Sequence, residues 1–139
     1  RGGTFSGNPM ACAAVSSTLG QLDASDFDAL LERGDALRVA IERLFSDQGI
    51  RITTSGYGNV FAIWLGAAAP TTYAQALQIA NPAFSKALHL ALREAGVLIM
   101  PSPYGRLYLS FAHTDRVIEE MKVAFNRAAL QLSVDYANG

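Results

Sequence analysis

A glycine-rich turn near the first residue has the composition of an anion-binding loop. Residues 2–9 read Gly-Gly-Thr-Phe-Ser-Gly-Asn-Pro and run directly into an apolar stretch. Glycine lets backbone N–H groups approach a ligand closely, and a helix N-terminus adds unpaired donors and partial positive charge. Asn8 is a favoured N-cap and Pro9 suits the first helical position, so a helix is expected directly after the loop. These residue types suit a phosphate contact, and they equally suit a loop that only turns the chain.

Arg106 is the second residue whose chemistry points to a ligand. The segment 106–111 alternates in polarity. One expected face carries Leu107, Leu109 and Phe111, and the other carries Arg106, Tyr108 and Ser110. A guanidinium group is planar and binds a carboxylate through two parallel hydrogen bonds. Arg106 is therefore a candidate substrate-binding residue, and the favoured alternative is an exposed arginine at the end of a strand.

The histidines and the cysteine indicate no catalytic centre of their own. His113 could act as a general acid or base near neutral pH, but its place beside Thr114 favours a structural hydrogen-bonding role. His89 and Cys12 have no partners at the spacing of a metal site or an activated nucleophile. We therefore predict no catalytic residue and no metal site in this chain.

Composition indicates a packed protein and limits its partners. Of 139 residues, 50% are hydrophobic and 17% are charged, which fits a globular core of one domain or slightly more. The net charge of −1 gives no electrostatic footprint for nucleic acid or an anionic membrane surface. No apolar run reaches membrane-spanning length, and the single cysteine is compatible with a reducing cytosol. Because residue 1 is arginine and lies inside a motif, we expect a piece of a longer protein.

The elements that would position these residues alternate between helices and strands. Helices are expected over 9–22, from Ser25 to before Gly49, from Pro82 to Gly96, and from Thr114 onward. Strands are expected over 50–54, 59–65, 97–100 and 106–111, with a turn over 55–58. Residues 60–65 are apolar on both alternations, which indicates burial on both faces. The segment 66–81 gives no clear pattern. The expected fold is α+β, an α/β sandwich in which helices cover a small, largely antiparallel sheet.

Two motifs together resemble a known family. The segment Gly2–Ala11 is similar to the loop that follows the catalytic lysine region in class III pyridoxal-phosphate aminotransferases, most nearly in the glutamate-1-semialdehyde aminomutase branch. The segments 96–102, Gly-Val-Leu-Ile-Met-Pro-Ser, and 109–114, Leu-Ser-Phe-Ala-His-Thr, resemble motifs near the family's C-terminus. The resemblance covers essentially the whole chain. It implies the C-terminal part of a fold type I transferase, with 1–22 ending the large cofactor-binding domain and 23–139 forming the small C-terminal domain.

The resemblance also implies a cofactor, pyridoxal 5′-phosphate, and a homodimer. The family's threonine at this motif position contacts the cofactor phosphate of the neighbouring subunit, and that role falls here on Gly3 and Thr4. The family's cofactor-attaching lysine lies upstream. Lys86 and Lys122 fall on polar helix faces outside any such motif. We therefore expect a cytoplasmic, homodimeric parent enzyme and no activity from the isolated chain.

The substrate stays open at this point. The resemblance implies a small amino acid or amino-aldehyde. The family's carboxylate-binding arginine aligns better with Ser110 than with Arg106, and the aminomutase pattern usually has a glutamate near Gly105, which this sequence lacks. This departure makes an ω- or β-amino acid transaminase a competing interpretation. An α+β binding or interaction module without catalysis is the alternative from a different functional class.

Overall fold

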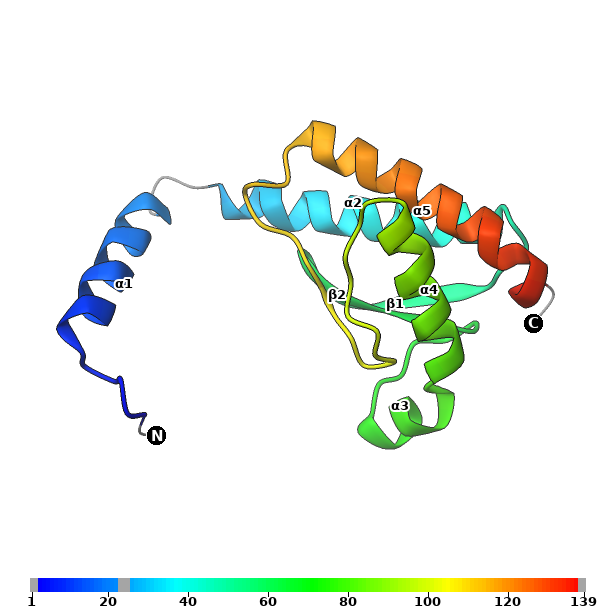
Figure 1. Cartoon of the computed structure of the whole chain (residues 1–139), viewed down its shortest axis with the longest axis horizontal. Helices are drawn as coiled ribbons and strands as arrows, with labels where there is room; N and C mark the ends of the chain where they lie inside the picture. Colours follow the sequence, from blue (N-terminus) through cyan, green and yellow to red (C-terminus); the bar gives the residue numbers. More distant parts are fainter. Residues whose placement is uncertain (1–2, 23–25, 138–139) are drawn as a thin grey trace.

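The computed structural model describes residues 3–22 and 26–137 (Figure 1). The elements follow one another as α1 (Pro9–Leu22), α2 (Phe27–Ser46), β1 (Ile52–Tyr57), β2 (Val60–Leu65), α3 (Tyr73–Ile79), α4 (Pro82–Glu94), β3 (Leu107–Tyr108) and α5 (Asp115–Tyr136). The sheet is antiparallel throughout, with the strand order β1-β2-β3. The expected α+β class with a small antiparallel sheet covered by helices is confirmed.

Strands β1 and β2 form a hairpin whose turn lies later than the sequence predicts. Tyr57 pairs with Val60, so Gly58 and Asn59 alone make the turn. Gly58 has a φ of 50°, a left-handed conformation that glycine adopts without strain. The predicted turn over 55–58 is therefore wrong, because residues 55–57 continue the ladder. The strand predicted for 50–54 begins at Ile52, and the buried Ile50 precedes it.

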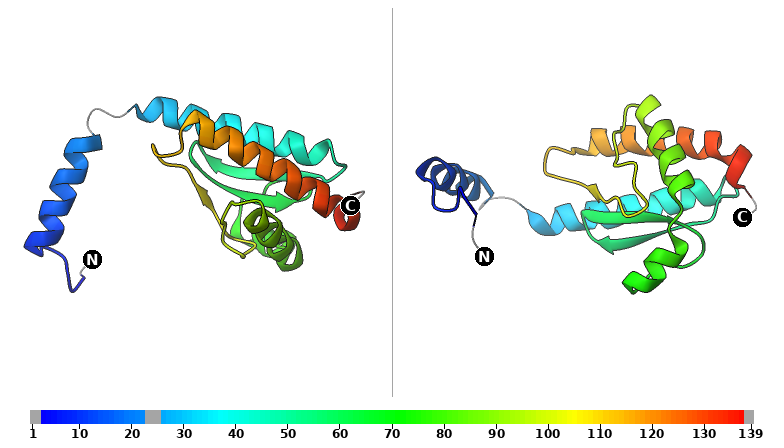
Figure 2. Two further views of the ribbon diagram at one scale, coloured as in Figure 1. Left: turned by 45° about the horizontal axis from the view of Figure 1, so that its top comes forward. Right: turned by 60° about the horizontal axis from the view of Figure 1, so that its bottom comes forward.

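The main core lies between one face of the sheet and the helices α2, α4 and α5 (Figure 2). Phe61 and Ile63 of β2 point into this core, where the fully buried side chains include Leu37, Ile41, Phe45, Leu92 and Phe125. On the opposite face of β2, Ala62 and Trp64 pack with Ala76 of α3 in a smaller cluster. Burial of strand β2 on both faces is thus confirmed.

Helix boundaries follow local capping chemistry, with differences from the sequence prediction. Helix α1 has its predicted bounds, and helix α4 begins with Asn81 as N-cap and Pro82 at its first position. Helix α2 is capped by Asp26, whose carboxylate accepts from the Ala29 N–H, whereas the predicted cap Ser25 lies outside the described residues. Thr114 occupies the N-cap position of α5, but its side chain makes no capping hydrogen bond.

Two predicted strands are largely absent, and one helix was missed. The predicted strand 97–100 pairs with no described strand, and the predicted strand 106–111 reduces to Leu107–Tyr108. Helix α3 begins with a capping box in which Thr72 and Gln75 exchange hydrogen bonds with each other's backbone. The spacing Thr-x-x-Gln signals such a start, so the helix was detectable within the unassigned segment.

Helix α1 stands apart from the rest of the described chain (Figure 1). None of its residues is buried. The division into 1–22 and 23–139 stays a prediction. Among the described helices, none combines the length and apolarity that crossing a bilayer requires.

Replacement of Leu37 by alanine should lower the free energy of unfolding by about 2–5 kcal/mol. Leu37 is 0% exposed in the centre of α2, so truncation leaves a cavity in the main core. Chemical denaturation monitored by circular dichroism measures the change. A loss below about 0.5 kcal/mol would show that the side chain is not packed as described.

Replacement of Gly34 by alanine should also destabilise the fold, by about 1–3 kcal/mol. A Cβ at this position would overlap the backbone of Gly58 in the hairpin turn. Gly20→Ala in α1 is the matched control, because a Cβ there meets no atom within 4 Å. Equal unfolding free energies for both variants would contradict the close approach of α2 to the hairpin.

Candidate functional site

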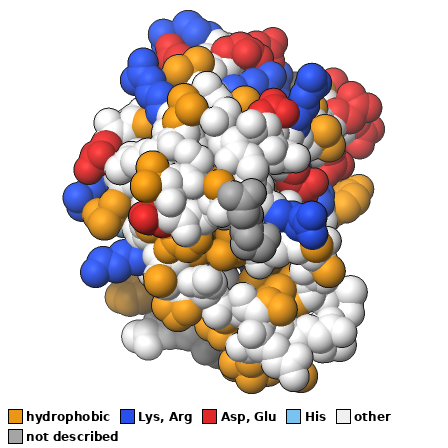
Figure 3. Space-filling view, turned by 90° about the vertical axis from the view of Figure 1, so that its right-hand side faces the viewer, with side chains coloured by type: hydrophobic (Ala, Val, Ile, Leu, Met, Phe, Trp, Pro, Cys, Tyr) orange, Lys and Arg blue, Asp and Glu red, His pale blue; other side chains and the backbone are white. Residues whose placement is uncertain are grey.

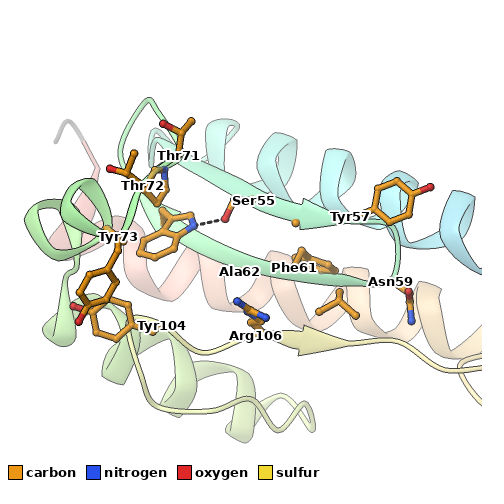
Figure 4. A pocket seen from close by; sticks show the side chains of 15 residues that line it. Ser55, Tyr57, Asn59, Phe61, Ala62, Thr71, Thr72, Tyr73, Tyr104 and Arg106 are labelled. Atoms are coloured by element: carbon orange, nitrogen blue, oxygen red, sulfur yellow. Dashed lines mark hydrogen bonds between the residues drawn. The ribbon is translucent and has the colours of Figure 1, made fainter.

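The face of the sheet that points away from α2 carries a hollow of about 810 Å³ (Figure 4). We call it the open-face hollow, and its lining includes Ser55, Ala62, Trp64, Tyr73, Tyr104 and Arg106. Ser55 and Ala62 are register partners on β1 and β2. Their side chains are small, so they leave space in front of the sheet that Arg106 and the aromatic residues border. A volume of this size matches those of small-molecule sites.

Trp64 forms a fixed wall of the open-face hollow. Its indole Nε1–H donates to Ser55 Oγ over 2.7 Å, drawn as the dashed line in Figure 4. The Tyr104 ring meets the indole edge to face, with centroids 6.4 Å apart and an interplanar angle of 68°. A hydrogen bond on one side and an aromatic contact on the other hold the indole in one orientation.

The loop before β3 presents Tyr104 and Arg106 to the hollow. The Gly105 N–H donates to Ser102 O over 2.9 Å, and the Tyr104 N–H donates to Ser102 Oγ over 3.3 Å. A Cβ on Gly105 would lie 3.0 Å from Ser102 O and 3.1 Å from Met100 O. The loop is therefore closed tightly around a residue without a side chain.

Arg106 faces an uncharged wall. Its guanidinium makes no ion pair or hydrogen bond with the described residues. The sequence holds no aspartate, glutamate, lysine or arginine between Arg51 and Lys86, the segment that supplies β1, β2 and α3. Arg106 is also the only charged residue among those described as lining the hollow. Figure 3 shows the wider pattern, with charged side chains gathered over α2 and α5 and few over α3. Arg106 thus offers an unneutralised positive charge to a ligand.

The N-terminal loop is a turn that leads into a capped helix. The Ser6 N–H donates to Gly3 O over 3.0 Å, and Asn8 Oδ1 accepts from the N–H groups of Met10 and Ala11. Asn8 therefore occupies helix donors that an anion would otherwise use. Thr4 is exposed and makes no hydrogen bond with any described residue. Its hydroxyl and N–H are therefore among the donors that the loop leaves for a ligand.

The structure unites some of the sequence-predicted residues and separates others. Arg106 and Tyr108 are exposed while Leu107 and Leu109 are buried, as the alternation predicts, but Phe111 is exposed, because the strand covers only Leu107–Tyr108. Gly3 and Thr4 lie beside α1, which Figure 1 shows apart from the sheet, so this chain does not bring them to Arg106. Their roles as binding residues stay predictions.

His113 is a structural residue, as its surroundings in the sequence favoured. Its Nδ1 accepts from the Ser110 N–H over 3.0 Å and lies 3.1 Å from Ser110 Oγ. Its carbonyl accepts from Arg33, which also pairs with Asp115 at 3.1 Å. These contacts join the end of the sheet to the start of α5. His89 has a similar role, because its Nδ1 lies 2.6 Å from Ile99 O.

Sequence reasoning missed the aromatic side of the open-face hollow. Trp64 lies on the strand expected to be buried on both faces, and Tyr73 lies on helix α3, within the segment that gave no clear pattern. Tyr104 precedes the predicted strand by two residues and gave no periodic signal. Only the capping box at Thr72 could have indicated that Tyr73 begins a helix beside the sheet.

Searches against known proteins found relatives over most of the chain, although no family model matches. The chain is 34% identical to a glutamate-1-semialdehyde 2,1-aminomutase of Nitratidesulfovibrio vulgaris over 113 residues, which cover 81% of the chain and 26% of the relative. An aminomutase of the same name from Thermoplasma volcanium is 33% identical over 130 residues, 94% of the chain and 30% of the relative.

Solved structures agree. An ω-transaminase from Sphaerobacter thermophilus superposes on this chain with a TM-score of 0.75 and 28% sequence identity. The match covers 96% of this chain and 30% of the transaminase chain. The chain corresponds to one segment of these proteins. The aminotransferase-like segment spans less than a third of the relatives' length, which is consistent with the expected C-terminal position. A β-phenylalanine aminotransferase from Variovorax paradoxus, with 22% identity and a TM-score of 0.66, shares the fold.

Gly105→Ala should destabilise the aminotransferase-like segment by about 1–3 kcal/mol, because the added Cβ crowds the carbonyls of Met100 and Ser102. It should also change the fluorescence of Trp64, since the loop carries the contacting Tyr104. Thermal unfolding and emission spectra measure the two effects. Unchanged melting and emission would mean that the loop is not closed around Gly105.

Proposed function

We propose that the protein containing this segment is a pyridoxal-phosphate-dependent aminotransferase or aminomutase. The observation that carries the proposal is the similarity to curated aminomutases over 81–94% of the chain, together with the fold shared with an ω-transaminase. When bound, the cofactor supplies the electron sink that allows an amino group to move between molecules.

Gly3 and Thr4 would hold the phosphate of the cofactor. The donor set fits that group, because an exposed hydroxyl and backbone N–H groups are the ligands that phosphate accepts at turns. Asn8 already caps α1, so the contact falls on Thr4 rather than on the helix end. The contact is proposed to reach the cofactor of the neighbouring subunit in a cytoplasmic homodimer. The cofactor-attaching lysine would come from outside this chain, which alone would be inactive.

Arg106 would bind a carboxylate of the amino substrate. It is exposed, borders the open-face hollow and faces an uncharged wall. A bidentate pair with a carboxylate would orient the substrate as well as bind it.

A transaminase is the second candidate beside the aminomutase. The specific observation in its favour is that the loop around Gly105 holds no glutamate, whereas the aminomutase pattern usually has one near this position.

In the complete protein, Thr4→Val should weaken cofactor retention by about one to two orders of magnitude. A hydrogen bond to a charged group contributes about 1.5–3 kcal/mol, and valine keeps the shape of threonine without its hydroxyl. Equilibrium dialysis against pyridoxal phosphate, followed by its absorbance, measures the affinity. Thr18→Val is the matched control, because the Thr18 hydroxyl is exposed and donates within α1 to Ala14 O.

A heterodimer tests the cross-subunit contact. One subunit carries Thr4→Val and the other lacks the upstream lysine. The remaining lysine site then receives Thr4 from the other subunit and should retain cofactor normally. Affinity as low as in the Thr4→Val homodimer would refute the contact between subunits, and no loss in that homodimer would refute the phosphate role itself.

A further inference from the structure

Three aromatic side chains gather at one end of the open-face hollow, and carboxylate binding by Arg106 does not explain them. Trp64 comes from β2, Tyr104 from the loop before β3 and Tyr73 from the first turn of α3. Figure 4 shows Tyr73 and Tyr104 at the same end of the hollow, with Arg106 farther along the sheet. Elements far apart in the sequence thus place their rings beside one binding surface.

The three rings differ in what they offer to a ligand. Trp64 is 8% exposed, so its ring is buried in the wall of the hollow, while Tyr104 and Tyr73 are 44% and 75% exposed. The hydrogen bond from Trp64 to Ser55 and the edge-to-face contact with Tyr104 hold the Trp64 indole in one position. The exposed rings of Tyr104 and Tyr73 beside the fixed Trp64 ring form a surface suited to a flat apolar group. Such a group buries its apolar surface on the rings and loses little conformational entropy on binding.

Charge distribution limits the ligand further. Arg106 is the only charged residue among those described as lining the hollow. One cation suits one carboxylate, and a second carboxylate at the aromatic end would lose its hydration without a partner. A small molecule with a single carboxylate and an apolar ring is therefore complementary to the hollow at both ends.

We propose that Tyr104 and Tyr73 are specificity-determining residues that select ligands combining one carboxylate, held by Arg106, with a flat apolar body. The proposal rests on the proposed function where it identifies this ligand as the amino substrate. The closed Gly105 loop sets the distance between the two recognition elements, because Tyr104 and Arg106 flank it. A shorter acid reaches Arg106 without the rings, and an uncharged ring compound meets the rings without Arg106.

Direct binding to the full chain tests the proposal with three matched probes. The probe 3-phenylpropionate carries both groups, butyrate carries only the carboxylate and 2-phenylethanol only the ring. Trp64 is the only tryptophan in the sequence, so its fluorescence reports on the hollow itself. Isothermal titration calorimetry gives a second readout for variants that alter the emission. We expect saturable binding of 3-phenylpropionate at least about tenfold tighter than that of either partial probe, the factor that about 1.4 kcal/mol supplies.

Substitutions separate the two recognition elements. Arg106→Gln should weaken 3-phenylpropionate binding by about 10- to 100-fold, whereas Arg127→Gln on α5 should not. Tyr104→Ala and Tyr73→Ala should each weaken it by about 2- to 10-fold and leave butyrate binding unchanged. Tyr108→Ala is the control for these, because Tyr108 is exposed on the same side of the sheet but does not line the hollow.

Any of three results would overturn the proposal. It fails if 3-phenylpropionate does not saturate, if butyrate binds equally well, or if Tyr104→Ala and Tyr73→Ala have no selective effect. Failure of the proposed function has a different signature. The complete protein would then bind no pyridoxal phosphate, while the probe affinities of the full chain would still depend on Arg106 and Tyr104.

Discussion

The close approach of helix α2 to the β1–β2 hairpin is the constraint on which the rest of the structure depends. Gly34 of α2 lies against the backbone of Gly58, and Leu31 of the same helix fills the space that a side chain on Gly58 would need. Hydrogen bonds between α2 and strand β1 add to this contact. Glu42 accepts from the Thr54 N–H over 2.7 Å, and Arg38 donates to Thr54 Oγ1 over 3.2 Å. Because α2 is attached along the hairpin, one sheet face is committed to the main core.

The candidate site is a consequence of that commitment. With Phe61 and Ile63 turned toward the helices, the alternation of the strand turns Ala62 and Trp64 the other way. The second face then carries small residues in the middle and aromatic residues at one end. Helix α3 closes that end without any charged residue, so Arg106 keeps its charge for a ligand. Packing on one side of the sheet thus sets the recognition chemistry on the other.

The two proposed binding elements of the chain have different structural support. Arg106 directly precedes β3, which pairs with β2, and it follows a loop in which the Gly105 N–H donates to Ser102 O over 2.9 Å. Thr4 lies in a turn next to a helix with no buried residue. The aminomutase relatives are more than three times longer than this chain.

Local signals in the sequence determined the helices and the central strand. The cap at Asn8, the helix start at Pro82, the glycine stop at Gly96 and the doubly apolar strand β2 are properties of neighbouring residues, and they appeared where expected. The loop motif and the segment around Ser110 were enough to indicate the family. The alternation around Arg106 also correctly placed it opposite the core.

What only the tertiary structure decided depends on contacts between distant segments. Residues 97–100 have strand composition but pair with none of the described strands, because a strand requires a neighbour as well as propensity. The assembly of Trp64, Tyr73 and Tyr104 beside Arg106 likewise follows from the packing of β2, α3 and the Gly105 loop, and no periodicity within one segment encodes it.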